Sequence, residues 1–189
     1  MVDYLIKKSA HPLSGFYLND HRKLNDTLNT LEQQNQKTIL LGVTFALLDF
    51  AEEFPQPLKN TIVMETGGMK GRREEIAREE LHTILCNAFK VEHIYSEYGM
   101  TELLSQAYSK GNGIFQTPPW MKVFTRDVND PLQFTIVQSG VINIIDLANL
   151  DSCSFLATSD LGRCLPDGSF EVLGRLDYSD IRGCNLLVQ

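Results

Sequence analysis

Residues 60–102 read NTIVMETGGMKGRREEIAREELHTILCNAFKVEHIYSEYGMTE, and the order of elements in this stretch indicates the fold class. An apolar strand is predicted over Asn60 to Glu65, and the glycine-rich turn TGGMKG follows it. A helix is predicted over Arg72 to Phe89, because apolar residues recur through it at helical spacing, at Ala77, Leu81, Ile84 and Ala88. Val91 to Ser96 is then a short strand that leads into the loop EYGMTE.

The residues upstream carry the same alternation of strand and helix. Thr38 to Val43 (TILLGV) is an apolar run typical of a buried strand, and Phe45 to Phe54 is a helix ended by Pro55 and Pro57. Weak helical spacing also marks Leu24 to Leu31. Strands that alternate with helices predict an α/β fold with helices packed on a parallel sheet. Ligands of such sheets bind beyond the carboxyl ends of the strands, where TGGMKG and EYGMTE both fall.

The pattern changes after Gly113 to short β-like runs separated by turn residues. Asp167-Gly168 is a hairpin signal between two of these runs. An antiparallel, β-rich subdomain or small barrel is therefore expected. We predict two parts, an α/β part over residues 1–112 and a β-rich part over 113–189. The predicted strands are Trp120 to Thr125, Phe134 to Gln138, Val141 to Leu147, Phe155 to Ser159 and Ser169 to Leu173.

Composition excludes several functional classes. The chain has 189 residues, of which 43% are hydrophobic and 22% charged, as in an ordinary globular protein. The net charge of −7 argues against a nucleic-acid partner, which would need a clustered basic face. No apolar run reaches the roughly 18 to 20 residues of a membrane span. The first residues have no signal-peptide core, so a cytoplasmic location is expected.

The four cysteines, Cys86, Cys153, Cys164 and Cys184, have spacings that match no zinc pattern. In a reducing compartment they are expected to be free thiols. Cys86 falls in the predicted helix, whereas Cys153 and Cys164 fall among the predicted strands. Cys184 lies in the tail, close to the end of the sequence.

Three spaced motifs indicate the chemistry. They are Tyr98 to Glu102 (YGMTE), Thr158 to Gly162 (TSDLG) and Gly174 to Asp177 (GRLD). In this order, with Gly67-Gly68 upstream, they resemble the adenylate-forming superfamily of acyl-CoA synthetases, peptide-synthetase adenylation domains and luciferases. The resemblance covers roughly Thr61 to the end and implies the fold of the large domain of these enzymes. ATP and Mg²⁺ are the implied cofactors.

The resemblance also implies an adenosine site. Gly67 and Gly68 would let the backbone approach the flat base closely, because glycine has no Cβ; the alternative is a tight turn before a helix. Tyr98 would stack on adenine, with Gly99 and Met100 in the same nucleotide-binding loop.

Two further residues of this loop would contact the phosphates. Thr101 would hydrogen-bond a phosphate oxygen, and Glu102 would be a hard oxygen ligand for Mg²⁺. The alternative for Glu102 is a solvated surface carboxylate or a charge at a helix N-terminus.

The last two motifs would bind the sugar. Asp160, predicted to follow a strand, matches the aspartate that accepts hydrogen bonds from the ribose hydroxyls. Arg175 would reach the ribose or a phosphate with its rigid guanidinium fork, or is otherwise a surface arginine on a hairpin. Asp177 matches the hinge position of the family.

Two family features have no counterpart in the sequence. Met1 to Lys37 contains nothing like the Ser/Thr/Gly-rich phosphate loop, and the small C-terminal domain with its adenylating lysine is missing. We therefore expect a C-terminal fragment of the large domain, incomplete for catalysis by itself.

The tail, Asp180 to Val188 (DIRGCNLLV), resembles the acyl-protein synthetases of the bacterial bioluminescence type (LuxE-like). In that family a C-terminal cysteine carries the acyl group as a thioester. Cys184 would have this role, helped by Arg182, and a fatty acid would be the substrate. An acyl reductase or another acyl-transfer protein would be the partner. The alternatives are a ligase like phenylacetate-CoA ligase, with coenzyme A as acceptor, and a non-catalytic nucleotide-binding module.

Overall fold

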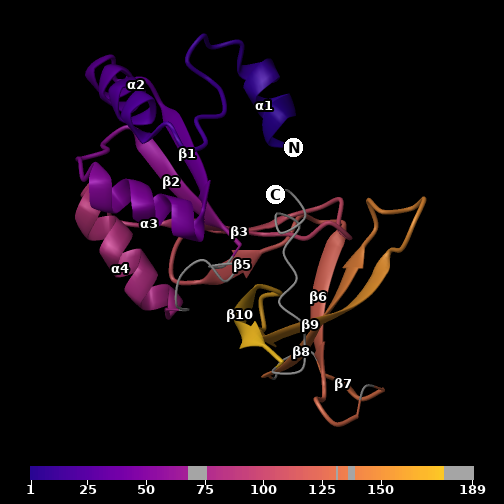
Figure 1. Ribbon diagram of the computed structural model, residues 1–189. Coiled ribbons are helices and arrows are strands. Elements are labelled where there is room, and N and C mark those ends of the chain that lie inside the picture. Colours follow the sequence, from indigo (N-terminus) through magenta and orange to yellow (C-terminus); the bar gives the residue numbers. More distant parts are fainter. Residues whose placement is uncertain (68–75, 131, 136–138, 177–189) are drawn as a thin grey trace.

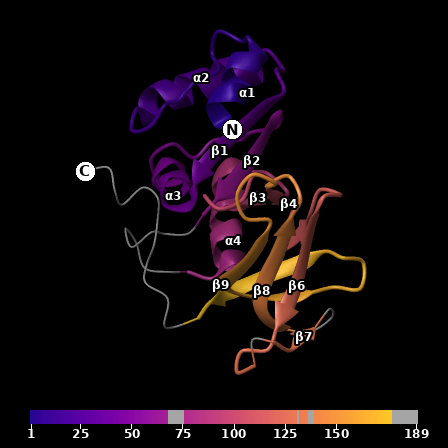
Figure 2. The same ribbon diagram turned by 90° about the vertical axis from the view of Figure 1, so that its right-hand side faces the viewer.

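The computed structural model describes residues 1–67, 76–130, 132–135 and 139–176. Gly68, Asp177, Arg182 and Cys184 lie outside the described residues. The helices are α1 (Val2–Ser9), α2 (His21–Gln33), α3 (Thr44–Glu53) and α4 (Arg78–Phe89). They gather at one end of the molecule, and the antiparallel strands form the other end (Figures 1 and 2).

The described strands form one continuous mixed sheet. Its strands are β1 (Thr38–Val43), β2 (Thr61–Thr66), β3 (Tyr95–Tyr98), β4 (Ala107–Ser109), β5 (Ile114–Gln116), β6 (Met121–Arg126), β7 (Phe134–Thr135), β8 (Ser139–Asp146), β9 (Phe155–Cys164) and β10 (Phe170–Arg175). Their order across the sheet is β1-β2-β3-β4-β5-β10-β9-β8-β6-β7. The parallel strands β1, β2 and β3 carry the predicted α/β part, and antiparallel pairing begins between β3 and β4.

The core beneath β1 and β2 is formed by one face of each strand and by α2, α3 and α4. Alternate residues of β2 point inward, so Val63 is buried whereas Ile62 is exposed. Phe50 of α3 and Phe89 of α4 stack with ring centroids 5.8 Å apart. The buried residues of α4 are Leu81, Leu85 and Phe89, so only Leu81 of the four residues that marked the predicted spacing is buried, and Ile84 is exposed.

The helix α4 begins later than the sequence predicts. Ala77 has extended backbone angles (φ −61°, ψ 143°), so the helix begins at Arg78 rather than Arg72. The end at Phe89 is as predicted, because Lys90 takes a left-handed conformation (φ 54°) that stops the helix. Ile76 packs against the core without being helical.

The antiparallel half has a core of its own. The rings of Phe115 in β5 and Phe170 in β10 stack with centroids 5.5 Å apart, and Ile142 and Ile144 of β8 are buried beside them. The predicted Asp167-Gly168 turn joins β9 to β10 and closes with a bond from Leu165 N to Ser169 O at 2.8 Å. Among the described residues, no helix has the length and apolar character needed to cross a membrane.

Candidate functional site

The carboxyl ends of β2 and β3 lie side by side. Thr66, the last residue of β2, pairs with Glu97 in parallel register, and β3 continues one residue further to Tyr98, which pairs with Ala107 of β4. The Thr44 hydroxyl, at the start of α3, donates to the Gly67 carbonyl oxygen directly after β2. Gly67 has φ 70°, a conformation that favours glycine.

Three of the predicted nucleotide-binding residues converge beside this edge. The Tyr98 hydroxyl donates to Asp160 Oδ2 at 2.7 Å, and Arg175 Nε lies 3.3 Å from Asp160 Oδ1. Asp160 and Arg175 are directly paired across β9 and β10. Pairing of the two strands therefore places an aspartate and an arginine from separate sequence motifs against the tyrosine of a third.

Asp160 lies inside a strand rather than after one. The strand was predicted to end at Ser159, but β9 continues to Cys164, because β10 pairs with it along the motif TSDLG. Gly162 is required by packing here: a Cβ at this position would lie 2.5 Å from the Glu171 carbonyl oxygen and 2.5 Å from Ile142 Cδ1.

The ring of Tyr98 is packed on two sides. It meets Phe115 and Phe170 edge-on, with centroid distances of 5.9 Å and 5.5 Å. Burial raises the pKa of the Tyr98 hydroxyl, and the neighbouring Asp160 charge raises it further. Tyr98 is therefore a neutral hydrogen-bond donor to the carboxylate at physiological pH.

The loop after Tyr98 exposes Thr101 and Glu102 and buries Leu103. The residues directly after Leu103 are held by Asp146, a fully buried carboxylate at the end of β8. Its Oδ2 accepts from Leu104 N at 3.0 Å and Ser105 N at 2.8 Å, and its Oδ1 accepts from Ser105 Oγ at 2.7 Å. These hydrogen bonds hold the backbone of the loop in place shortly after the exposed Glu102.

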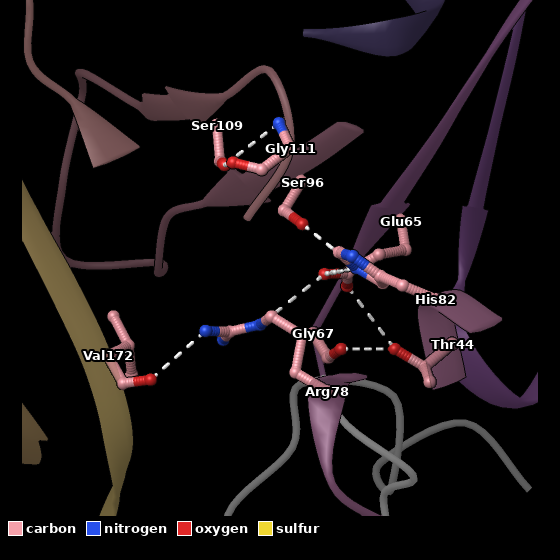
Figure 3. A network of polar contacts seen from close by, with 9 residues as sticks. All are labelled: Thr44, Glu65, Gly67, Arg78, His82, Ser96, Ser109, Gly111 and Val172. Carbon is pink, nitrogen blue, oxygen red and sulfur yellow. Dashed lines mark hydrogen bonds and ion pairs between the residues drawn. The ribbon is translucent and has the colours of Figure 1, made fainter. Parts of the chain in front are cut away.

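A polar network lies beside Thr44 and Gly67 (Figure 3). Glu65 Oε1 is 3.7 Å from His82 Nε2 and 4.0 Å from Arg78 Nε, while the Thr44 hydroxyl is 3.4 Å from Oε2. Ser96 Oγ, on β3, is 3.5 Å from His82 Nε2. Glu65 is almost fully buried, so nearby cationic and hydroxyl groups must compensate for its lost hydration.

Arg78 also links the two halves of the molecule. Its Nη1 donates to the Val172 carbonyl oxygen of β10 at 3.0 Å, and its guanidinium lies 5.3 Å from the centre of the Phe115 ring (Figure 3 for the Val172 contact). Sequence motifs did not identify this network. The available signal for Glu65 was its position: it is an acidic residue two places after Val63, on the same inward face of β2.

The three described cysteines differ in accessibility. Cys86 is half-buried and Cys164 is buried, and burial raises the pKa of both thiols, which disfavours the thiolate. Cys153 lies between two strands, as predicted, in the loop that joins β8 to β9, and it is exposed. Within the described residues, no three His, Cys, Asp or Glu side chains are grouped as a metal site.

No family model matches the chain, and no curated protein matches it in sequence. Solved structures do match it. ATP-bound MatB from Rhodopseudomonas palustris is 14% identical with a TM-score of 0.61, over 85% of this chain and 34% of that one. Coronafacic acid ligase from Pectobacterium brasiliense is 19% identical with a TM-score of 0.55, over 82% and 32%.

A third similar structure is the O-succinylbenzoate coenzyme A synthetase MenE from Bacillus subtilis, in complex with AMP. It is 21% identical with a TM-score of 0.52, over 80% of this chain and 34% of that one. The chain thus spans about a third of the length of these ligases. At these identities the likeness concerns the fold alone, and it confirms the predicted α/β fold, in which a parallel sheet with flanking helices is followed by antiparallel strands.

Proposed function

We propose that this chain is part of a ligase that activates a carboxylic acid with ATP. The observation that carries the proposal is the convergence of Tyr98, Asp160 and Arg175, in a fold shared with ATP-bound and AMP-bound structures. In the reaction, the acid carboxylate attacks the α-phosphorus of ATP. An acyl-phosphate bond forms, the bond between the α- and β-phosphates breaks, and pyrophosphate leaves.

Asp160 fits the sugar of the nucleotide. An ionised carboxylate offers about four lone-pair sites, and the Tyr98 hydroxyl and Arg175 each take one oxygen. Lone pairs therefore remain for two ribose hydroxyls. Because Arg175 is half exposed, its guanidinium is also able to turn towards an α-phosphate, where its permanent charge would stabilise developing negative charge.

Thr101 and Glu102 fit the phosphate end. Both side chains are exposed on a loop whose following residues are fixed by Asp146. Mg²⁺ is commonly held by one or two carboxylates together with substrate phosphates, so the single carboxylate of Glu102 suffices. When bound, the ion would neutralise charge on the phosphate oxygens.

The acyl acceptor is proposed to be the thiol of Cys184, as in LuxE-like acyl-protein synthetases. A thiolate would attack the acyl carbonyl of acyl-AMP, giving a thioester and releasing AMP. Coenzyme A is the second candidate, because the similar solved structures include a coenzyme A synthetase. Cys153, exposed in the loop after β8, is the competing thiol among the described residues.

Nucleotide binding is tested first, by calorimetry with AMP. Asp160→Asn should weaken AMP binding about tenfold, since a hydrogen bond to a charged group contributes about 1.5 kcal/mol or more. Arg163→Gln is the matched control, because Arg163 lies on the same strand but pairs with Glu171 at 2.5 Å. Equal affinities of both variants and the wild type would remove Asp160 from the site.

Adenylation is tested by ATP–pyrophosphate exchange in the full-length protein. Glu102→Gln keeps the size of the side chain but loses the charge, so exchange should fall most at low Mg²⁺. Unchanged exchange at low Mg²⁺ would exclude Glu102 as a metal ligand.

The acceptor is identified by incubation with ATP, Mg²⁺ and a labelled fatty acid, followed by mass spectrometry. Label on Cys184 that hydroxylamine removes would support a thioester, and Cys184→Ser should lose it while still forming acyl-AMP. Label on Cys153, or wild-type labelling of Cys184→Ser, would contradict the assignment.

A further inference from the structure

A second set of hydrogen bonds reaches the Glu102 loop from the segment between β8 and β9. The amide nitrogen of buried Asn149 donates to the Glu102 carbonyl oxygen at 2.9 Å and to the Cys153 carbonyl oxygen at 3.0 Å. Its amide oxygen accepts from the Ser152 hydroxyl. Because an asparagine amide donates only from its nitrogen, the two carbonyl partners by themselves fix the orientation of the side chain.

The Asn149 backbone is held as well as its side chain. Its N–H donates to the Asp146 carbonyl oxygen at 3.1 Å, and its own carbonyl oxygen accepts from the Ser154 hydroxyl at 2.9 Å. Asp146 in turn binds the amides of Leu104 and Ser105. The segment 146–154 therefore holds the loop at two points, at Glu102 and directly after Leu103.

The exposed carboxylate of Glu102 needs such support. A glutamate on a loop loses rotamer and backbone freedom when it binds a metal ion, and this cost weakens binding. Fixing the peptide on which the carboxylate is carried reduces the cost before the ion arrives. Asn149 lies 47 residues further along the chain, and no sequence motif pointed to it.

We propose that Asn149 is a positioning residue for metal–nucleotide binding: its amide clamps the Glu102 peptide and so presents the Glu102 carboxylate towards the phosphates. This inference rests on the proposed adenylating function. It adds that the β8–β9 loop sets the affinity of the site for Mg²⁺, although no contact between this loop and the nucleotide is predicted.

The test compares Asn149→Asp with Ser152→Ala in the full-length protein. Asn149→Asp preserves the shape but replaces the donor nitrogen with oxygen, so both bonds to carbonyl groups are lost. Ser152→Ala is the matched control, because it removes a hydroxyl from the same cluster and no bond to Glu102. Asn149→Ala is the second variant, in case a buried carboxylate prevents folding.

The first readout is hydrogen exchange of a peptide covering residues 99–107, followed by mass spectrometry. Exchange should be about tenfold faster in the Asn149 variants than in the wild type and in Ser152→Ala, since local opening becomes easier when a loop loses its anchor. Exchange at the wild-type rate would overturn the proposal that Asn149 holds the loop.

The second readout is the Mg²⁺ concentration that gives half-maximal ATP–pyrophosphate exchange. Asn149→Asp should raise this concentration about tenfold, and it should add no further change in a Glu102→Gln background. An equal effect in both backgrounds would mean that Asn149 does not act through Glu102 and would overturn the proposal. If the wild type shows no Mg²⁺-dependent ATP–pyrophosphate exchange, the proposed function is rejected. The hydrogen-exchange measurement still decides whether Asn149 holds the loop.

Discussion

Replacing Asp146 with asparagine should destabilise the protein and change its response to acid. Asp146 is fully buried and accepts four hydrogen bonds: from Leu104 N, from Ser105 N, from Ser105 Oγ and from Ala148 N at 3.1 Å. Burial alone would raise the pKa of the carboxyl, but the hydrogen bonds from Ser105, Ala148 and Leu104 outweigh it and hold the pKa below its ordinary value.

The size of the effect follows from these bonds. Asparagine keeps one acceptor oxygen, but its NH₂ group must face donors that previously met a carboxylate oxygen. Hydrogen bonds to a charged group contribute about 1.5–3 kcal/mol each, and a buried donor left without an acceptor costs about 1–3 kcal/mol. Partial relaxation of the loop limits the loss, so Asp146→Asn should cost about 2–3 kcal/mol at pH 7. For a chain of this length, that lowers Tm by about 4–12 °C.

Acid should remove this difference. Because the folded-state pKa of Asp146 is depressed, its stabilisation is present above the unfolded-state pKa of about 3.9 and is lost as the pH falls through the folded-state pKa. The wild type and Asp146→Asn should therefore differ by a constant free energy of unfolding between about pH 5 and 7. Below about pH 4 the difference should begin to shrink, and it should be lost once the pH has fallen below the folded-state pKa of Asp146.

Urea denaturation followed by circular dichroism, at several pH values, is the assay. Asp167→Asn is the control substitution. The pKa of Asp167 is also lowered by hydrogen bonds, from Ser169, but this residue lies on an exposed turn rather than in the core. The reasoning is refuted if Asp146→Asn is as stable as the wild type at pH 7. It is also refuted if the difference in stability is the same at pH 3 as at pH 7.

Two further substitutions test the packing around the site. Gly162→Ala should lower the free energy of unfolding in urea by about 1–3 kcal/mol, since its Cβ would lie 2.5 Å from a backbone oxygen of the neighbouring strand. A decrease below about 0.5 kcal/mol, on the order of a surface substitution, would show that the strands separate easily. Arg78→Met should lower the free energy of unfolding by about 1–2 kcal/mol, because it removes the bond to Val172 and leaves the buried charge of Glu65 with less compensation. Adding Glu65→Gln should recover part of this loss. Full additivity of the two substitutions would show that Glu65 and Arg78 do not interact.

Local patterns were sufficient to predict most of the elements. The apolar run TILLGV became β1 with the predicted ends, and Asp167-Gly168 became the hairpin turn between β9 and β10. The turn depends on interactions within a few residues, and the strand on a short run of apolar residues, so a sequence pattern records both directly. The order of the motifs likewise predicted the fold that the solved ligases share with the chain.

Pairing between distant segments was decided by the tertiary structure. The sequence predicts a strand that ends at Ser159, but pairing with β10 extends β9 through Asp160 and brings Arg175 against it. Asp146 and Asn149 showed no motif, because their importance comes from bonds to a loop more than 40 residues earlier in the chain.

The sequence by itself thus determined most of the short segments that become strands, helices and turns, although it did not indicate α1, β4 or β5. Only the tertiary structure decided that one sheet runs through both halves and that Arg78 joins α4 to β10. The physical reason is the range of the interactions. Helical spacing and turn preferences act between neighbours in sequence, whereas the burial of Glu65 and Asp146 depends on partners that meet only when the whole sheet has formed.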